Sequence, residues 1–257
     1  MRAELARSPA FDIGVPAARV AKALAHYWDN VDHAAHWVHS SWIAASLGIP
    51  DARLQDWRAL LEGAPSGVAA RCSRALVRML DVTPPGCSEL SQGGFVHAGT
   101  VIGLEPNACL LDVVPAPQAM RIWRMRALLW RRDEVRRLID RHERARLVDW
   151  TGLDMDVMMR GQNIDWANDA TRLVAAAMPP LGLMNASSLA IEGMLLMLRD
   201  LKGSRGLPFP LSRLALPRYI DVPAWIKALP AHCDEAGTER LFRRLPELLG
   251  EWVWLFG

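Results

Sequence analysis

The stretch Gln118–Trp150, QAMRIWRMRALLWRRDEVRRLIDRHERARLVDW, contains neither glycine nor proline and is rich in Arg, Leu, Met and Ala. These residues lose little side-chain freedom in a helix and are among the best helix formers. Thr151 and Gly152 follow, and a glycine just past a helix commonly adopts the left-handed conformation that ends it. The sequence therefore predicts one long helix over residues 118–150.

The regions on both sides of this stretch have helical patterns too. Between residues 16 and 47, apolar side chains recur at steps of three and four, the period of a helix with one buried face. Thr238 is a suitable N-cap for a last helix. Further helices are predicted over residues 16–47 (one helix or two in series), 154–160, 164–178 and 186–201, and from residue 238 onward.

Residues 87–105 have the least decided pattern. Their glycines weaken a helix, whereas Phe95, Val96, Val101 and Ile102 suit strands. A small β-hairpin near residues 95–103 is therefore an alternative to helix. Sustained β alternation is absent from the sequence, and short segments rich in proline and glycine separate the helices. We expect an all-α fold, a compact multi-helix domain with short connections.

The length and composition are those of a folded protein. The 257 residues are 51% hydrophobic and 23% charged, with a net charge of +2. We expect residues 1–257 to form a single helical domain, with the alternative of an N-terminal sub-bundle (16–82) packed on residues 106–257. The first residues lack the apolar run of a secretory signal, and the longest uncharged stretch, 173–191, contains two prolines. We therefore expect a cytoplasmic protein without direct membrane insertion.

Motifs that indicate an enzyme are absent. The sequence has no Gly-x-Ser-x-Gly elbow, no Walker-type phosphate loop and no dinucleotide-binding glycine fingerprint. The four cysteines lie 15, 22 and 124 residues apart, which fits neither a zinc knuckle nor a disulfide framework. We expect no catalytic residues and no cofactor.

One histidine-rich segment suggests a metal site as an alternative. Asp29 and His33, and likewise Asp32 and His36, are four residues apart and would share a helix face. Zinc and di-iron sites need three or four convergent ligands, and the sequence has neither Glu-x-x-His nor His-Glu-x-x-His. We predict no metal, and keep an all-α metalloenzyme that uses Asp32, His33, His36 and His39 as an alternative.

Positive charge is concentrated in the long predicted helix. Residues 121–146 contain ten arginines and four acidic residues, a local net charge of +6. They could form a solvated face with internal ion pairs such as Asp133 with Arg137, contact nucleic-acid phosphates, or pair with carboxylates of an acidic protein partner. We predict a protein partner and no nucleic acid, and keep an arginine-helix nucleic-acid-binding protein as an alternative. The residues that we predict to bind the partner are Arg131, Arg132, Arg136 and Arg137.

The chain has 11 tryptophans, and most should pack between helices. Trp252 and Trp254 are two residues apart, so on a helix they point to different sides. We predict that the Trp254 side chain is not used in the core and binds a partner protein.

Four stretches of the chain together have a familiar pattern. They are ALAHYWDN (23–30) running to WVHSSW (37–42), MRIWRMRALL (120–129), RRLIDR (136–141) and LSRLALPR (211–218). With these stretches the chain resembles the SctK (YscK/PscK-like) family in its plant-pathogen, Hrp branch, which comprises cytosolic components of type III secretion systems.

The resemblance implies a virulence-associated, non-enzymatic adaptor of the secretion sorting platform. Such an adaptor would lie between the cytoplasmic domain of the SctD-like inner-membrane ring protein and the SctQ-like pod, which connects to SctL and the ATPase. It would be cytoplasmic and peripheral to the inner-membrane apparatus. The family has no motif-defined binding residues to transfer.

Overall fold

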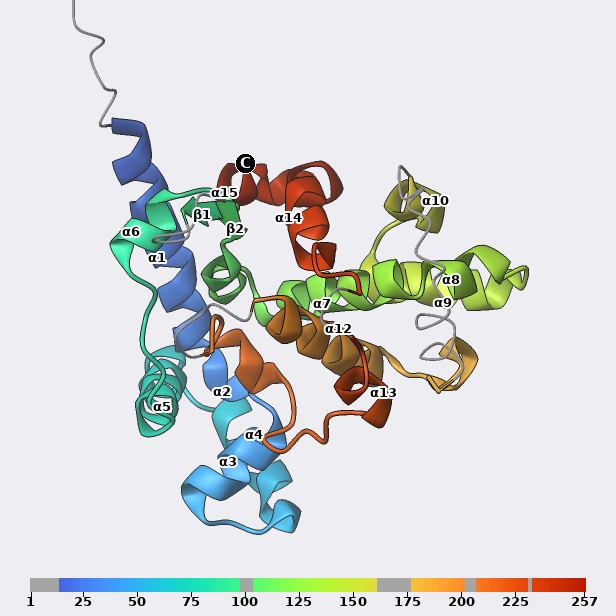
Figure 1. Ribbon diagram of the computed structural model, residues 1–257. Helices are drawn as coiled ribbons and strands as arrows, with labels where there is room; N and C mark the ends of the chain where they lie inside the picture. The colour runs from blue at the N-terminus through green and yellow to red at the C-terminus, as the bar shows by residue number, and fades with distance from the viewer. Residues whose placement is uncertain (1–13, 98–103, 161–176, 202–206, 231–232) are drawn as a thin grey trace, which may run out of the picture.

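The computed structural model describes residues 14–97, 104–160, 177–201, 207–230 and 233–257, and most of them are helical (Figure 1). The first six helices are α1 (Gly14–Asp32), α2 (Ala34–Trp37), α3 (Ser40–Leu47), α4 (Leu54–Glu62), α5 (Ser66–Met79) and α6 (Cys87–Ser91). The others are α7 (Ala116–Trp130), α8 (Arg132–Arg137), α9 (Arg141–Thr151), α10 (Met155–Met159), α12 (Ala186–Asp200), α13 (Ala224–Lys227), α14 (Gly237–Leu248) and α15 (Val253–Phe256).

Short 3-10 turns and one hairpin complete the secondary structure of the described residues. The 3-10 turns are η1 (Asp51–Arg53), η2 (Ala108–Asp112), η3 (Leu181–Leu183), η4 (Ser212–Ala215) and η5 (Gly250–Trp252). Strand β1 (Phe95–His97) pairs antiparallel with β2 (Leu104–Pro106), with Phe95 opposite Pro106. The all-α class is confirmed. The alternative of a small hairpin near residues 95–103 agrees with the structure at β1, and the strand paired with it is Leu104–Pro106. Residues 98–103 lie outside the described residues.

The arginine-rich stretch 118–150 forms three helices, so the prediction of a single long helix is wrong. The first break is at Arg131, which has φ −85° and ψ 17° and separates α7 from α8. The second precedes α9, where the Asp140 carboxylate accepts a hydrogen bond from the His142 N–H and caps the helix. Arg131 is a good helix former, so tertiary contacts override its propensity at the first break. Asp140 is a weak helix former and a favoured N-cap, so the second break has a local cause that the propensity of the whole stretch hid.

Other helix predictions have mixed outcomes. The stop at Gly152 is confirmed, since this residue has φ 66° and its N–H donates to the Val148 carbonyl. The helix predicted over 186–201 is confirmed as α12, and that over 154–160 as α10. The segment 16–47 is divided into α1, α2 and α3. Thr238 does not cap α14, which begins one residue earlier. The helix predicted over 164–178 lies almost wholly outside the described residues.

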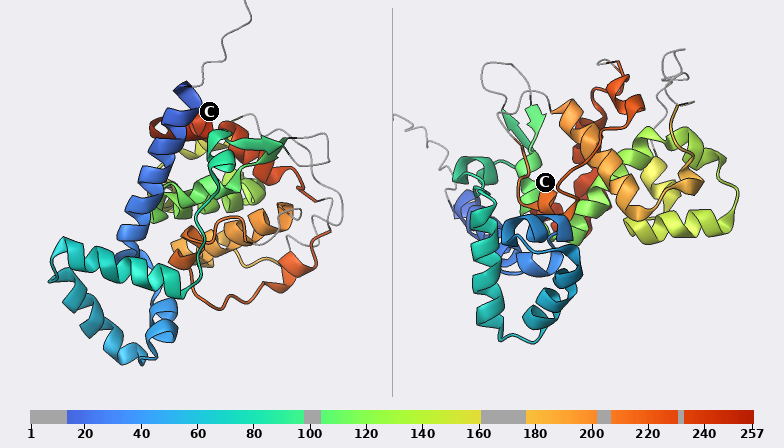
Figure 2. Two further views of the ribbon diagram at one scale, coloured as in Figure 1. Left: turned by 90° about the vertical axis from the view of Figure 1, so that its left-hand side faces the viewer. Right: turned by 90° about the horizontal axis from the view of Figure 1, so that it is seen from below.

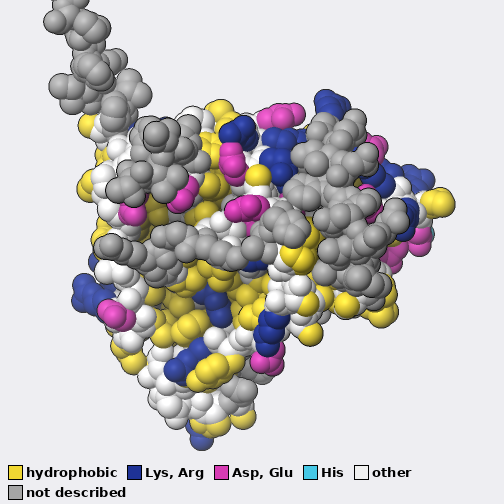
Figure 3. Space-filling view, in the orientation of Figure 1, with side chains coloured by type: hydrophobic (Ala, Val, Ile, Leu, Met, Phe, Trp, Pro, Cys, Tyr) yellow, Lys and Arg dark blue, Asp and Glu magenta, His cyan; other side chains and the backbone are white. Residues whose placement is uncertain are grey.

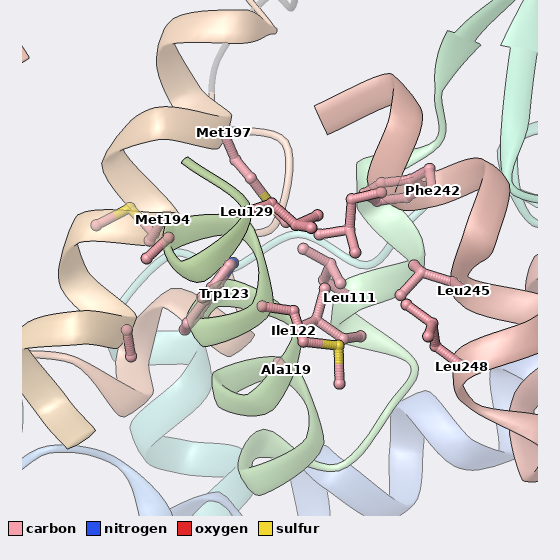
Figure 4. Packing of buried hydrophobic residues seen from close by; sticks show 14 of the residues in the cluster. Leu111, Ala119, Ile122, Trp123, Leu129, Met194, Met197, Phe242, Leu245 and Leu248 are labelled. Atoms are coloured by element: carbon pink, nitrogen blue, oxygen red, sulfur yellow. The ribbon is translucent and has the colours of Figure 1, made fainter. Parts of the chain in front are cut away.

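The centre of the molecule is the crossing of α7 and α12 (Figure 1). Gly193 of α12 lies against the α7 backbone, and a Cβ atom added there would be 1.7 Å from the Trp123 carbonyl oxygen. Only glycine lets the two helices approach this closely. Figure 4 shows α7 with Met194 and Met197 of α12 on one side and Phe242 and Leu245 of α14 on the other. Burial of these apolar side chains is the main stabilising contribution.

A second apolar cluster lies among the N-terminal helices and is completed from far along the chain. Leu211 and Leu214, at η4, are buried in it. Its other buried members are Tyr27, Val31, Ala34, Val38, Ile43, Leu54, Leu76 and Val77. The chain from η4 therefore runs back into the N-terminal part of the fold. The division into 16–82 and 106–257 stays a prediction.

Buried polar contacts join this second cluster to the centre. The Asn30 amide donates to the carbonyls of Asp112, Val113 and Val114 at 2.8–3.1 Å. The Asp112 carboxylate accepts hydrogen bonds from the backbone N–H groups of Leu211 (3.1 Å) and Ser212 (2.7 Å). Burial raises the pKa of Asp112 to about 7, although these hydrogen bonds oppose the rise.

The C-terminal helix α15 packs beside α1 and the hairpin, as both views in Figure 2 show. The Gly94 N–H donates to the Phe256 carbonyl (3.1 Å), and Arg19 Nη1 donates to the Gly257 carbonyl (3.0 Å). A Cβ atom on Gly93 or Gly94 would lie within 2.5–2.6 Å of these two carbonyl oxygens. Gly93 and Gly94, two of the glycines that weaken a helix over 87–105, therefore make room for the end of α15.

Candidate functional site

The arginines of α7 and its junction with α8 point into the protein. The Arg131 side chain has no exposed surface, and its Nε and Nη2 donate to the two carboxylate oxygens of Glu192 at 2.6 and 2.7 Å. Its Nη1 donates to Glu134 (2.9 Å) and to the Pro179 carbonyl (2.9 Å). Burial raises the pKa of Glu192, while the hydrogen bonds from Arg131 oppose the rise. A bidentate pair of this kind offsets the cost of removing both charges from water.

Arg126 forms a second buried ion-pair cluster. Its side chain is fully buried, with Nη2 2.7 Å from Asp200 and Nη1 2.8 Å from Asp234. The Thr238 hydroxyl donates to the same Asp200 carboxylate at 2.6 Å. Burial lowers the pKa of Arg126, but the two carboxylates raise it more, so the net shift is upward. This cluster ties α7 to α12 and to the start of α14.

The remaining α7 arginines also have intramolecular partners. Arg121 donates to the Thr151 carbonyl (2.8 Å), and Arg124 donates to the carbonyls of Ala186 and Trp150 (both 2.9 Å). A continuous basic face on one helix, which the nucleic-acid alternative requires, is therefore not formed. The ion pair of Asp133 with Arg137, which the interpretation as a solvated face suggested, is not observed either; Asp133 pairs with Arg132.

Two of the four predicted partner-binding arginines lie at the surface. Arg131 is buried, and Arg132 is mostly buried beside Asp133, whereas Arg136 and Arg137 are exposed at the end of α8. Ile139, in the turn to α9, is 95% exposed. Leu183 of η3 is 83% exposed, and η3 is held beside α8 and α9 by hydrogen bonds of Leu181 with Glu134 and Arg146. We call Arg136, Arg137, Ile139 and Leu183 the α8–α9 corner.

Trp254, the fifth predicted residue, is half-buried and packs on α1. Its ring centroid lies 5.5 Å from that of His26 and 6.0 Å from that of Trp252. The Lys22 ammonium lies 3.9 Å from the ring centroid, a cation–π contact. These contacts help to hold α15 on α1, so Trp254 has a packing role in the structure. Its binding of a partner stays a prediction.

The residues of the metal alternative do not converge. Arg74 donates to both carboxylate oxygens of Asp32 at 2.5 and 2.6 Å, and the His39 side chain caps α3 by accepting from the Ser41 N–H. His33 bonds to the Asp29 carbonyl. Among the residues described, no group of three or more His, Cys, Asp or Glu side chains is arranged to hold a metal ion.

Sequence reasoning missed the carboxylates that hold the buried arginines: Glu192, Asp200 and Asp234. One signal was present for Glu192, the only charged residue in the apolar sequence from 173 to 198. A lone charge in a buried helix usually has a buried partner. The sequence does not show which arginine that partner is.

Helices that are both long and apolar enough to span a bilayer do not occur in the described part of the chain. A family model described as "Bacterial type III secretion protein (HrpB4)" matches residues 15–251. No curated protein and no solved structure gives a significant match to the chain.

Proposed function

Because this chain belongs to the HrpB4 family of bacterial type III secretion proteins, we propose that it is a non-enzymatic adaptor of the secretion sorting platform. In this role it links the cytoplasmic domain of the SctD-like inner-membrane ring protein to the SctQ-like pod. It acts in the cytoplasm, peripheral to the inner-membrane apparatus.

The observation that carries this proposal is the family match, which extends over almost the whole chain. The structure adds a helical body in which buried arginines pair with buried carboxylates. Such pairs fix the relative positions of α7, α12 and α14, which suits a part that holds two larger assemblies in register.

The α8–α9 corner is the first contact surface that we propose for one of these partners. Arg136 and Arg137 supply charge that steers association, and the exposed side chains of Ile139 and Leu183 supply apolar area. These groups lie at one end of the molecule, where α8 and α9 project away from the α1 side (Figure 1). A partner could therefore bind there without covering the N-terminal helices.

Co-expression tests the adaptor role. The full-length tagged chain is co-expressed with the SctQ-like protein and the SctD-like cytoplasmic domain of the same secretion system, and complexes are separated by size-exclusion chromatography. We expect both partners to co-elute with the chain. Recovery of neither partner would overturn the proposal.

Charge reversal then tests the corner. Arg136→Glu/Arg137→Glu should weaken binding of one partner and leave the other bound. The matched control is Arg71→Glu/Arg78→Glu, which makes the same charge change at exposed positions of α5. Equal binding by both double variants would show that the corner is solvated surface only.

A further inference from the structure

Two segments far apart in the sequence meet beside α3. The His39 N–H donates to the Leu214 carbonyl (2.8 Å), and the Arg218 N–H donates to the Ser41 hydroxyl (2.9 Å). The Trp42 indole N–H donates to the Leu216 carbonyl (2.9 Å), across 174 residues of sequence. These bonds hold the segment after η4 against the start of α3.

Arginine side chains gather around the Trp42 ring at this junction. The guanidinium carbons of Arg213 and Arg218 lie 5.6 and 5.9 Å from the Trp42 ring centroid. Arg218 also lies 5.2 Å from the ring centroid of Tyr219, which is 81% exposed. A guanidinium over an aromatic face is attracted by the ring electrons and keeps its N–H groups available at the edge.

The third arginine of this group is Arg58 of α4. Its Nη2 lies 3.4 Å from the Val38 carbonyl, and Arg213 donates to the carbonyls of Leu216 (3.2 Å) and Arg218 (3.3 Å). Burial lowers the pKa of His39, which follows Val38, and the charges of Arg58 and Arg213 lower it further. The charges of Arg58 and Arg213 therefore both act on the region around His39.

These charges differ from those of the buried arginines in having no carboxylate partner among the residues that the structure describes. Within the residues that the structure describes, no carboxylate forms an ion pair with Arg58, Arg213 or Arg218, whereas Arg126 and Arg131 have two carboxylates each. Like charges that lie near one another repel, and carboxylates of a partner would remove that repulsion. Arginines gathered without a carboxylate partner are a feature expected at a binding site, where a ligand supplies the missing charge.

We propose that Trp42, Arg58, Arg213, Arg218 and Tyr219, the basic aromatic patch, bind an acidic segment of another protein. Carboxylates of that segment would accept hydrogen bonds from the arginines, and an apolar side chain would pack on the exposed ring of Tyr219. Figure 3 shows Lys and Arg side chains among hydrophobic ones on the lower part of the molecule, where α2, α3 and α4 lie.

A protein partner fits these observations better than nucleic acid. The net charge of the whole chain is only +2, and the chain has three lysines, whereas proteins that bind a phosphate backbone usually carry a larger excess of positive charge. Arginines positioned by aromatic rings and backbone carbonyls suit bidentate pairing with carboxylates. This inference rests on the proposed function in one respect, namely that the partner is a protein.

Direct binding assays test the patch. The full chain is titrated into three fluorescent probes at low salt: a peptide of Asp, Glu and Leu, the same peptide with Asn and Gln in place of the acids, and single-stranded DNA. We expect the acidic peptide to bind and the amide peptide not to bind. Absence of acidic-peptide binding, or tighter binding of the DNA, would overturn the proposal.

Substitutions locate the binding. Arg58→Glu/Arg218→Glu changes two exposed side chains and should weaken acidic-peptide binding at least tenfold, whereas the charge-matched Arg71→Glu/Arg78→Glu should leave it within twofold. Tyr219→Ala removes only the exposed ring and should weaken binding without altering charge. An equal loss in the two double variants would mean that net charge, not the patch, binds the peptide.

The same variants separate this inference from the adaptor role. If the wild-type chain recovers both secretion partners and Arg58→Glu/Arg218→Glu recovers them equally well, the patch proposal is wrong and the adaptor role stands. If the wild-type chain recovers neither partner while the patch still binds the acidic peptide, the adaptor role is wrong and the patch stands.

Discussion

The Glu192→Gln substitution should strongly destabilise the protein, because it removes one charge of a buried pair and keeps its shape. Glu192 and Arg131 are both buried, and two hydrogen bonds of 2.6 and 2.7 Å join them. Removing one partner of a buried pair costs about 3–5 kcal/mol, since the remaining charge stays buried without compensation. Arg131 retains Glu134, whose side chain is 36% exposed, so the cost should lie near the lower end, about 3 kcal/mol.

Thermal unfolding followed by circular dichroism measures this cost. For a chain of this size each kcal/mol lowers Tm by about 2–4 °C, so we expect a decrease of about 6–12 °C. The control Glu134→Gln makes the same chemical change at the half-exposed carboxylate and should cost about 1 kcal/mol or less. The double variant Arg131→Met/Glu192→Leu, which removes both charges, should recover most of the lost stability.

The comparison also decides the role of Arg131. If Glu192→Gln lowers Tm no more than Glu134→Gln, the bidentate pair does not hold α12 on the end of α7. Arg131 would then be available for the partner contact predicted from the sequence. A large decrease would mean that substitutions of Arg131 disturb the fold before they report on binding.

Three further predictions use the same measurements. Gly193→Ala should destabilise by at least about 1–3 kcal/mol because its Cβ would overlap the Trp123 carbonyl, whereas Gly67→Ala in α5, where nothing lies within 4 Å, should be neutral or stabilising; equal effects would contradict the close crossing. Asp112 has a pKa raised to about 7, so its stabilising contribution is full below about pH 4 and is lost as the pH rises through 7; Asp112→Asn should flatten the dependence of the urea unfolding midpoint on pH, and an unchanged slope would refute this. Asn185→Ala removes the cap of α12 and should cost about 1 kcal/mol in urea unfolding, and a cost near zero would show that the cap is not needed.

Local sequence signals predicted much of the helical structure. The apolar run before Gly203 predicted α12, and Gly152 predicted the end of α9 because both signals act within one or two turns. The glycines near residue 93 correctly indicated an interruption. Their reason, the close approach of Phe256 and Gly257, depends on residues about 160 positions later. No local pattern could show it.

The candidate site was harder to predict, because exposure depends on the partner element and not on the residue type. Arg131 and Arg137 have the same side chain and lie within two turns, yet one is buried against Glu192 and the other is exposed. The sequence indicated a basic region but not which of its members point inward. The basic aromatic patch was missed for the same reason, since it forms only when the segment after η4 meets α3.

The position of Leu211 and Leu214 inside the N-terminal apolar cluster has a consequence for synthesis of the chain. The other members of that cluster, up to Val77, leave the ribosome first, but the cluster stays incomplete until residue 214 follows. At about 5–20 residues per second, this delay is roughly 7–30 s. During that time the nascent N-terminal helices expose apolar surface. A newly made chain therefore needs protection by chaperones for longer than a protein that folds progressively from its N-terminus, or must aggregate slowly enough to finish folding first.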